Sequence, residues 1–147
     1  MAARVLSGSV SDEDVREMYE DVRNDASETL WAVFKYGDAK TLEEAAIGGD
    51  YDEFLSFCGD NDRLFGYVAF ETGDEMSRRK KFAFITWIGP SVTPLKKAAV
   101  STDKAFIKNI CNQFGKEILA DELKEIQYDK IYKELERASG AAYGTGK

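Results

Sequence analysis

Apolar residues recur along the chain at two kinds of spacing, which predict helices in some segments and strands in others. Apolar positions three and four residues apart, such as Val15, Met18, Tyr19 and Val22, are typical of an amphipathic helix. Runs rich in aromatic and β-branched residues, such as LWAVFKY, are typical of strands. The predicted helices cover residues 12–24, 51–58, 102–118 and 125–138. The predicted strands cover residues 30–36, 40–47, 63–72, 81–88 and 117–120.

The order of these elements predicts an α+β fold in which helices sandwich a mixed sheet of about five strands as three layers. The pattern over residues 40–47 is weaker than the others and predicts an edge strand. A chain of 147 residues that is 44% hydrophobic is suited to one domain. We predict that this domain spans residues 12–140, between a flexible arm at 1–11 and a flexible tail at 141–147.

One glycine stands out in the predicted helix over residues 102–118. Gly115 costs roughly 1 kcal/mol relative to alanine inside a helix. At 100° per residue it shares a flat face with Lys104, Lys108 and Asn112. Either a partner makes use of the missing side chain, or the helix simply tolerates the glycine.

Histidine is absent from the chain, which limits the chemistry open to it. His-based general bases, Cys–His nucleophiles and His-containing zinc sites are excluded. Cys58 and Cys111 lie on predicted apolar helix faces, and we expect buried free thiols rather than a disulfide. The acidic segments at 12–14 and 43–44 do not have metal-loop spacing, and no glycine-rich phosphate loop is present. We therefore expect no enzymatic activity, no cofactor and no metal.

Hydropathy indicates a cytoplasmic protein without a transmembrane segment. No apolar run approaches the roughly 18 residues of a membrane span. The N-terminal segment also lacks the apolar region of a secretory signal.

Positive charge is concentrated in residues 77–108, within an otherwise acidic chain. This segment holds 8 of the 20 lysines and arginines and a single acid, so it carries a charge of +7 against −7 for the whole chain. A run of four basic residues, RRKK at 78–81, is most often a solvated loop. Here the run and the neighbouring helix would both present positive charge, which raises self-repulsion unless a negatively charged partner relieves it.

Three kinds of partner could supply that negative charge. Nucleic acid is disfavoured because the chain is acidic overall, with an isoelectric point near 4.7, and has no interleaved aromatic and basic residues. A membrane surface is disfavoured because the basic residues do not border a broad apolar helix face, although anionic lipid headgroups stay open as a second ligand. An acidic protein surface fits best.

The sequence resembles the actin-depolymerising factor homology family, and within it the coactosin group. The resemblance is carried by LWAVFKY, RLFGYVAFETGDEMSRRKKFAFITWIG, STDKAFIK and the ASGAAY ending, and it covers nearly the whole chain after residue 11. It implies a mainly antiparallel sheet with two helices on each side. It also implies a monomeric, non-enzymatic protein that binds actin filaments along their sides and belongs to the cytoskeleton.

Family members bind filaments through a basic loop between two strands, the long helix and the C-terminal helix. Carried over to this sequence, the implied filament-binding residues are Arg78, Arg79, Lys80, Lys81, Lys104, Lys108, Lys130, Lys133 and Arg137. Lys81 is the leading candidate, and Lys80 is an extra base relative to the family pattern. The longer N-terminal arm and the altered ending leave the roles of both termini open.

The resemblance implies that this protein modulates filament stability or capping without efficient severing. Two alternatives use the same basic surface. One is a cofilin-like factor that severs filaments or binds actin monomers, and the other is an adaptor for anionic lipids such as phosphoinositides.

Overall fold

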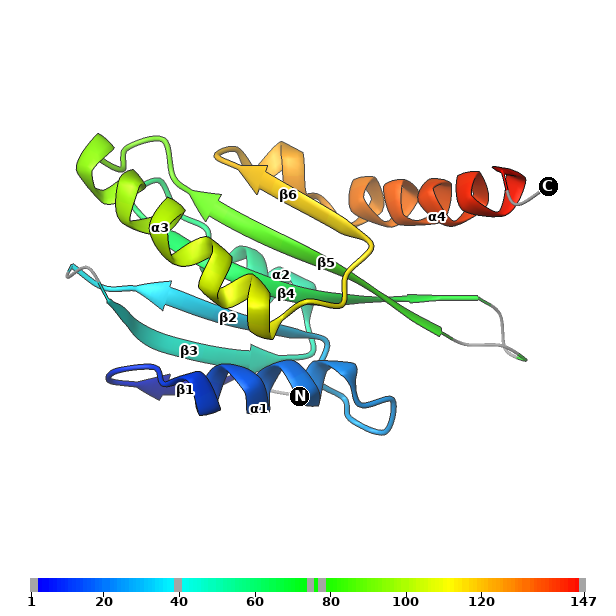
Figure 1. The fold of residues 1–147 in the computed structure, drawn as a ribbon, viewed down its shortest axis with the longest axis horizontal. Coiled ribbons are helices and arrows are strands. Elements are labelled where there is room, and N and C mark those ends of the chain that lie inside the picture. Colours follow the sequence, from blue (N-terminus) through cyan, green and yellow to red (C-terminus); the bar gives the residue numbers. More distant parts are fainter. Residues whose placement is uncertain (1–2, 39–40, 74–75, 77–78, 146–147) are drawn as a thin grey trace.

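The computed structural model describes residues 3–38, 41–73, 76 and 79–145, which form a twisted sheet covered by helices (Figure 1). The strands are β1 (Arg4–Ser7), β2 (Trp31–Tyr36), β3 (Leu42–Gly48), β4 (Arg63–Thr72), β5 (Arg79–Ile88) and β6 (Lys116–Ala120). The helices are α1 (Asp12–Arg23), α2 (Tyr51–Leu55), α3 (Pro94–Ile110) and α4 (Tyr128–Thr145), with a short 3-10 helix, η1 (Leu123–Ile126), before α4.

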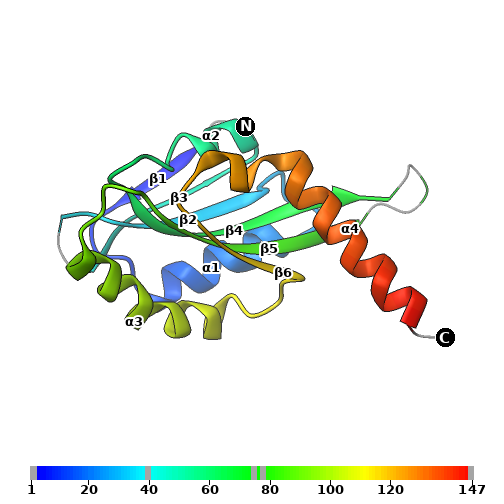
Figure 2. The ribbon, with the colours of Figure 1, turned by 90° about the horizontal axis from the view of Figure 1, so that it is seen from above.

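The strands form one six-stranded sheet in the order β1-β3-β2-β4-β5-β6. Neighbouring strands are antiparallel except β5 and β6, which are parallel and are connected through α3. Figure 2 shows α1 and α3 on one face of the sheet and α2 and α4 on the other. The predicted three-layer α+β fold, with its mixed and mainly antiparallel sheet, is confirmed.

Apolar side chains fill both faces of the sheet. The core beneath α1 and α3 includes the fully buried Tyr67 and Phe84. The core beneath α2 and α4 includes Trp31, Phe54 and Leu135. Because β4 contributes to both cores, its whole apolar run is buried, as expected for a strand covered on both faces.

The N-terminal segment differs from the prediction. Residues 4–7, predicted to belong to a flexible arm, form β1 with Arg4 opposite Ile47 and Ser7 opposite Glu44. Consequently β3, predicted to be an edge strand, lies between β1 and β2. Pairing with β1 satisfies backbone groups that β3 would otherwise expose along its edge.

The long helix starts and ends about eight residues earlier than predicted. Thr93 caps α3 by accepting a hydrogen bond from the Lys96 amide, and Pro94 occupies the first turn, where its missing N–H costs nothing. The hydroxyl of Thr102, predicted to lie near the helix start, instead donates to the Ala98 carbonyl oxygen in mid-helix. The helix ends at Ile110, so Gly115 lies in the following loop and not in a helix.

The C-terminal helix is also displaced relative to the prediction. It starts at Tyr128 and continues to Thr145, through part of the predicted flexible tail. Ile131 and Leu135 are buried as predicted, whereas Ala138 is exposed. The C-terminal half of α4 extends past the edge of the sheet (Figure 1).

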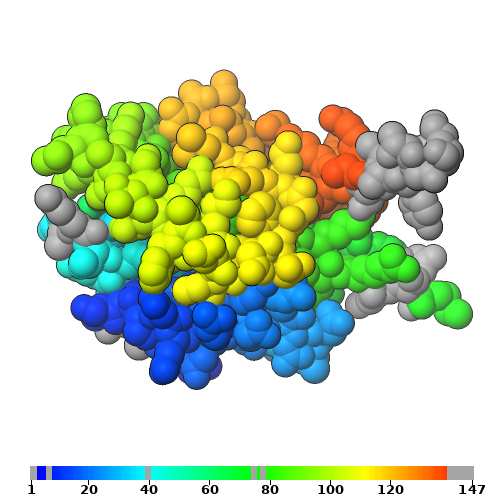
Figure 3. All heavy atoms as spheres, viewed as in Figure 1, coloured from blue at the N-terminus to red at the C-terminus, as the bar shows by residue number. Residues whose placement is uncertain are grey.

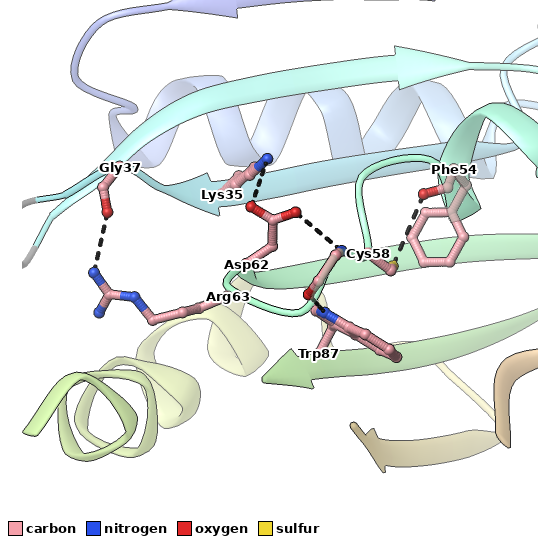
Figure 4. A network of polar contacts seen from close by, with 8 residues as sticks. Lys35, Gly37, Phe54, Cys58, Asp62, Arg63 and Trp87 are labelled. Atoms are coloured by element: carbon pink, nitrogen blue, oxygen red, sulfur yellow. Dashed lines mark hydrogen bonds and ion pairs between the residues drawn. The ribbon is translucent and has the colours of Figure 1, made fainter. Parts of the chain in front are cut away.

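A buried arginine, Arg63, joins the start of α3 to the sheet, and Figure 4 shows its contact with Gly37. Arg63 is 3% exposed and donates to the carbonyl oxygens of Lys96 at 3.2 Å and Gly37 at 3.1 Å. Its guanidinium lies 4.4 Å from the ring centroid of Tyr36. The Tyr36 hydroxyl in turn donates to the Asp103 carboxylate at 2.5 Å. These contacts fix α3 on the sheet at two of its turns.

Both cysteines are buried free thiols, as predicted. Cys58 donates weakly to the Phe54 carbonyl oxygen at 3.9 Å (Figure 4). Burial is the main cause that raises the pKa of Cys58 to about 12 and that of Cys111 to about 12. Neither thiol is therefore ionised near neutral pH.

Candidate functional site

The start of β5 divides the basic run between the two faces of the sheet. The strand begins at Arg79, two residues before the predicted start, and successive side chains in a strand point to opposite faces. Lys80 points toward α1, whereas Lys81 points toward α4. Arg79 is exposed and shares the side of Lys81 by alternation. Arg78 lies outside the described residues.

The ammonium group of Lys80 is bound to the end of α1. Its Nζ donates to the carbonyl oxygens of Val22 at 3.0 Å and Asn24 at 2.9 Å. Carbonyl groups at a helix C-terminus lack partners within the helix, and a cation is favourable there. Lys80 therefore connects the hairpin of β4 and β5 to the body of the protein.

We expect the substitution Lys80→Met to lower the free energy of unfolding by about 1–2 kcal/mol, because the carbonyl oxygens of Val22 and Asn24 each lose a hydrogen bond from a cation. Asn24 keeps the hydrogen bond that it accepts from the Ser27 amide. Urea denaturation followed by tryptophan fluorescence would measure this loss. Arg79→Met is the matched control, since Arg79 is an exposed neighbour, and its midpoint should equal that of the wild type. Equal losses in the two variants would contradict the capping role of Lys80.

Lys81 connects the hairpin to α4. Its Nζ lies 3.5 Å from the carboxylate of Glu136, and the two side chains are 23% and 42% exposed. An ion pair of this length and exposure contributes little to stability. The Lys81 ammonium can therefore exchange this weak partner for another carboxylate with little loss of folding free energy.

The two predicted lysines of α3 share one carboxylate on β6. The carboxylate oxygens of Glu117 lie 3.0 Å from Lys104 Nζ and 2.7 Å from Lys108 Nζ. Burial raises the pKa of Glu117, but hydrogen bonds from Lys108 and Lys104 outweigh burial and lower the pKa below its ordinary value. Glu117 thus holds the C-terminal half of α3 on the edge of the sheet.

We expect Glu117→Gln to reduce the acid sensitivity of the protein. The lowered pKa means that Glu117 stabilises the fold above its unfolded pKa and loses this contribution as pH falls through its folded pKa. The wild type should lose more stability than Glu117→Gln between about pH 5 and pH 3. The urea concentration at the midpoint of unfolding would be measured for both proteins across this pH range. If the prediction is wrong, the two midpoints will fall in parallel as the pH falls.

The predicted residues of α4 differ in how they are held. Lys130 lies 3.3 Å from Glu134, whose other oxygen lies 3.4 Å from Lys116 of β6. Burial raises the pKa of Glu134, and hydrogen bonds from Lys130 and Lys116 lower it overall. Lys133 and Arg137 are exposed and make no ion pair within the part of the chain that the structure describes.

The predicted site residues lie on three neighbouring elements. Figure 3 shows α3, the segment that follows it, α4 and the hairpin on one side of the molecule. The hairpin and the C-terminal half of α4 also project in the same direction from the sheet (Figure 1). We call the predicted site residues on these elements, apart from Lys80, the basic surface. Its described members are Arg79, Lys81, Lys104, Lys108, Lys130, Lys133 and Arg137.

The carboxylates that hold this surface did not emerge from the sequence. Glu134 follows Lys130 by four residues, and this helical spacing could have indicated their ion pair. Glu117 and Glu136 bind lysines on other elements, which no local spacing indicates.

Three acidic residues lie close together in the segment before α4, where their oxygens could in principle hold a metal ion. The carboxylate oxygens of Asp121, Glu122 and Glu125 lie within 4.8 Å of one another. However, one oxygen of Glu125 accepts hydrogen bonds from the amides of Asp121 and Glu122, both at 3.1 Å. This arrangement is a helix-capping motif, and we assign no metal to it.

Comparison with known proteins identifies close relatives. Residues 8–136 match the model of the cofilin/tropomyosin-type actin-binding protein family. The coactosin-like protein of Bos taurus is 41% identical over 138 residues, covering 94% of this chain and 96% of the relative.

Two solved structures of coactosin-type proteins resemble this chain over most of its length. The crystal structure of human coactosin-like protein has a TM-score of 0.79 and 40% identity, over 89% of this chain and 99% of that one. The solution structure of mouse coactosin, described as an actin filament binding protein, has a TM-score of 0.73 and 40% identity, over 97% of this chain and 99% of that one.

None of the helices in the described residues is both long enough and apolar enough to span a membrane.

Proposed function

This chain belongs to the cofilin/tropomyosin-type actin-binding protein family, and we propose that it is a coactosin-type protein that binds the sides of actin filaments through the basic surface. The near-complete coverage of coactosin-like proteins supports the coactosin type. We propose that this protein is a non-enzymatic binding module of the cytoskeleton.

The single observation that carries the proposal is the contact between the hairpin and α4 at Lys81. The weak ion pair with Glu136 joins Lys81 to α4, the helix that also carries the exposed Lys133 and Arg137. With exposed Arg79 on the same side of β5, this arrangement supports one continuous positively charged area. Such an area attracts and orients a negatively charged partner.

Co-sedimentation with actin filaments, beside a monomer-binding assay at matched salt, tests the proposal. We expect the protein to pellet with filaments and to bind monomers far more weakly. Binding should weaken as salt rises, because exposed charges are screened. The absence of pelleting even at low salt would overturn the proposal.

The effect of binding on the filament needs a separate measurement. The coactosin type implies side binding that modulates capping or stability without efficient severing. Fluorescence microscopy of single filaments would show stable lengths if this is correct. Rapid fragmentation would instead support the cofilin-like alternative.

A further inference from the structure

An open groove lies beside Lys81. It is bounded by β5, by α4 and by the loop that follows α3. It has a volume of about 450 Å³. Its walls are mainly apolar, and Lys81 is the one charged residue among the described residues that line it. The lining residues are Lys81, Phe82, Gln113, Phe114, Gly115, Leu135 and Ala138.

The groove exists because β6 covers only part of the edge of β5. The first residue of β6, Lys116, pairs with Ala83, so Lys81 and Phe82 extend beyond the start of β6. The Gly115 amide donates to the Phe82 carbonyl oxygen at 2.8 Å and fixes the loop at this point. A Cβ atom on Gly115 would lie 3.4 Å from Leu135 Cδ2, so the missing side chain of Gly115 leaves the space open.

The two aromatic walls are held by stacking. The ring of Phe82 stacks on Tyr67 with centroids 5.2 Å apart and planes 6° from parallel. Phe114 stacks on the fully buried Phe84 with centroids 5.6 Å apart. Since these rings are already fixed, an occupant would lose little free energy in ordering them.

Two cations lie at the groove, and each already has a carboxylate partner: Glu136 for Lys81 and Glu117 for Lys108. Lys81 lines it from β5, and Lys108 Nζ lies 5.9 Å from the ring centroid of Phe114. Apolar walls favour an apolar side chain, and flanking cations favour a carboxylate next to it.

We propose that this groove receives an apolar side chain of the actin filament that lies next to a carboxylate, with Lys81 binding that carboxylate. This inference rests on the proposed function. The groove would supply the apolar anchor of the interface, whereas the basic surface supplies its orientation.

Filling the groove without changing any charge tests this inference. We expect Gly115→Leu to weaken co-sedimentation with filaments by about tenfold or more, because the leucine occupies the site of the anchor. Gly115→Ala is the matched control and should bind within about twofold of the wild type, because its methyl group makes only ordinary contacts. The salt dependence of binding should be unchanged in both variants, since the cations remain.

A second variant protects the test against misfolding. Ala138→Leu fills the groove from α4, at an exposed helical position where leucine is well tolerated, and it should show the same loss. Circular dichroism establishes that each variant is folded.

The outcomes separate the two proposals. If the wild type fails to bind filaments, the proposed function falls. If the wild type binds and both leucine variants bind equally well, only the groove proposal falls. Flotation with phosphoinositide vesicles is the third measurement. If both leucine variants lose vesicle binding but still bind filaments, the groove binds a lipid and the inference is overturned.

Discussion

Replacing Lys81 with alanine is expected to weaken filament binding by about tenfold or more, while the protein stays folded. Lys81 is positioned where the hairpin, α4 and the groove meet. Among the described residues its only ion pair is with Glu136 at 3.5 Å, and this pair contributes little to folding, so the substitution should act on binding. Co-sedimentation over a range of salt concentrations would measure the loss.

Lys124→Ala is the matched control for this prediction. Lys124 is also an ion-paired lysine, 3.1 Å from Glu122, but it belongs to η1 and not to the basic surface. Both variants lose one positive charge, so a difference between them reports position and not net charge. Equal binding by Lys81→Ala and the wild type would remove Lys81 as the leading contact residue.

Arg63→Leu is expected to lower the free energy of unfolding by about 3 kcal/mol, the largest effect that we predict on stability. The substitution removes the hydrogen bonds that Arg63 donates to the part-buried carbonyl oxygens of Gly37 and Lys96, and it removes the cation above Tyr36. Urea denaturation followed by the fluorescence of Trp31 and Trp87, both buried, would measure the loss.

The control for Arg63 is Arg16→Leu, because Arg16 is an exposed arginine on α1. Arg63→Lys keeps the charge but replaces the planar guanidinium, whose two terminal nitrogens each donate to one carbonyl oxygen, with a single shorter ammonium group. Its stability should therefore lie between those of the wild type and the leucine variant. A loss below about 1 kcal/mol for Arg63→Leu would show that neighbouring groups replace these hydrogen bonds.

The sequence predicted elements well where local and tertiary preferences agree. β4 matches its predicted range of 63–72 because its apolar run is buried on both faces and is bounded by turn residues. The start of α1 at Asp12 agrees with the prediction, because the capping box of Ser11 and Asp14 is formed by residues close in sequence. β1 was missed because a four-residue strand has too few positions to show a pattern, and its pairing with β3 is tertiary.

The start of α3 lies earlier in the chain than predicted. Pro94 lies in the first turn of α3, eight residues before the predicted start at 102, and a proline in the first turn is compatible with a helix start. The end of α3 depends on where the chain must turn to form β6, and this is set by pairing with β5.

The candidate site was predictable in composition but not in geometry. The charge excess of residues 77–108 indicated a basic surface directly. The orientation of Lys80 and Lys81 depends on where β5 begins, and a shift of one residue would exchange their faces. The carboxylate partners of these lysines and the groove at Gly115 depend on contacts between elements that are distant in sequence.

The two buried thiols allow motion on each face of the sheet to be followed separately. Cys111 belongs to the core beneath α1 and α3, and Cys58 belongs to the core beneath α2 and α4. Because the native thiols are buried and protonated, alkylating reagents can modify each one only when its own layer opens. Mass spectrometry after pulsed alkylation would therefore give two opening rates from one unmodified chain. A rate at Cys111 that changes on filament binding, with a constant rate at Cys58, would localise the response of the protein to one layer.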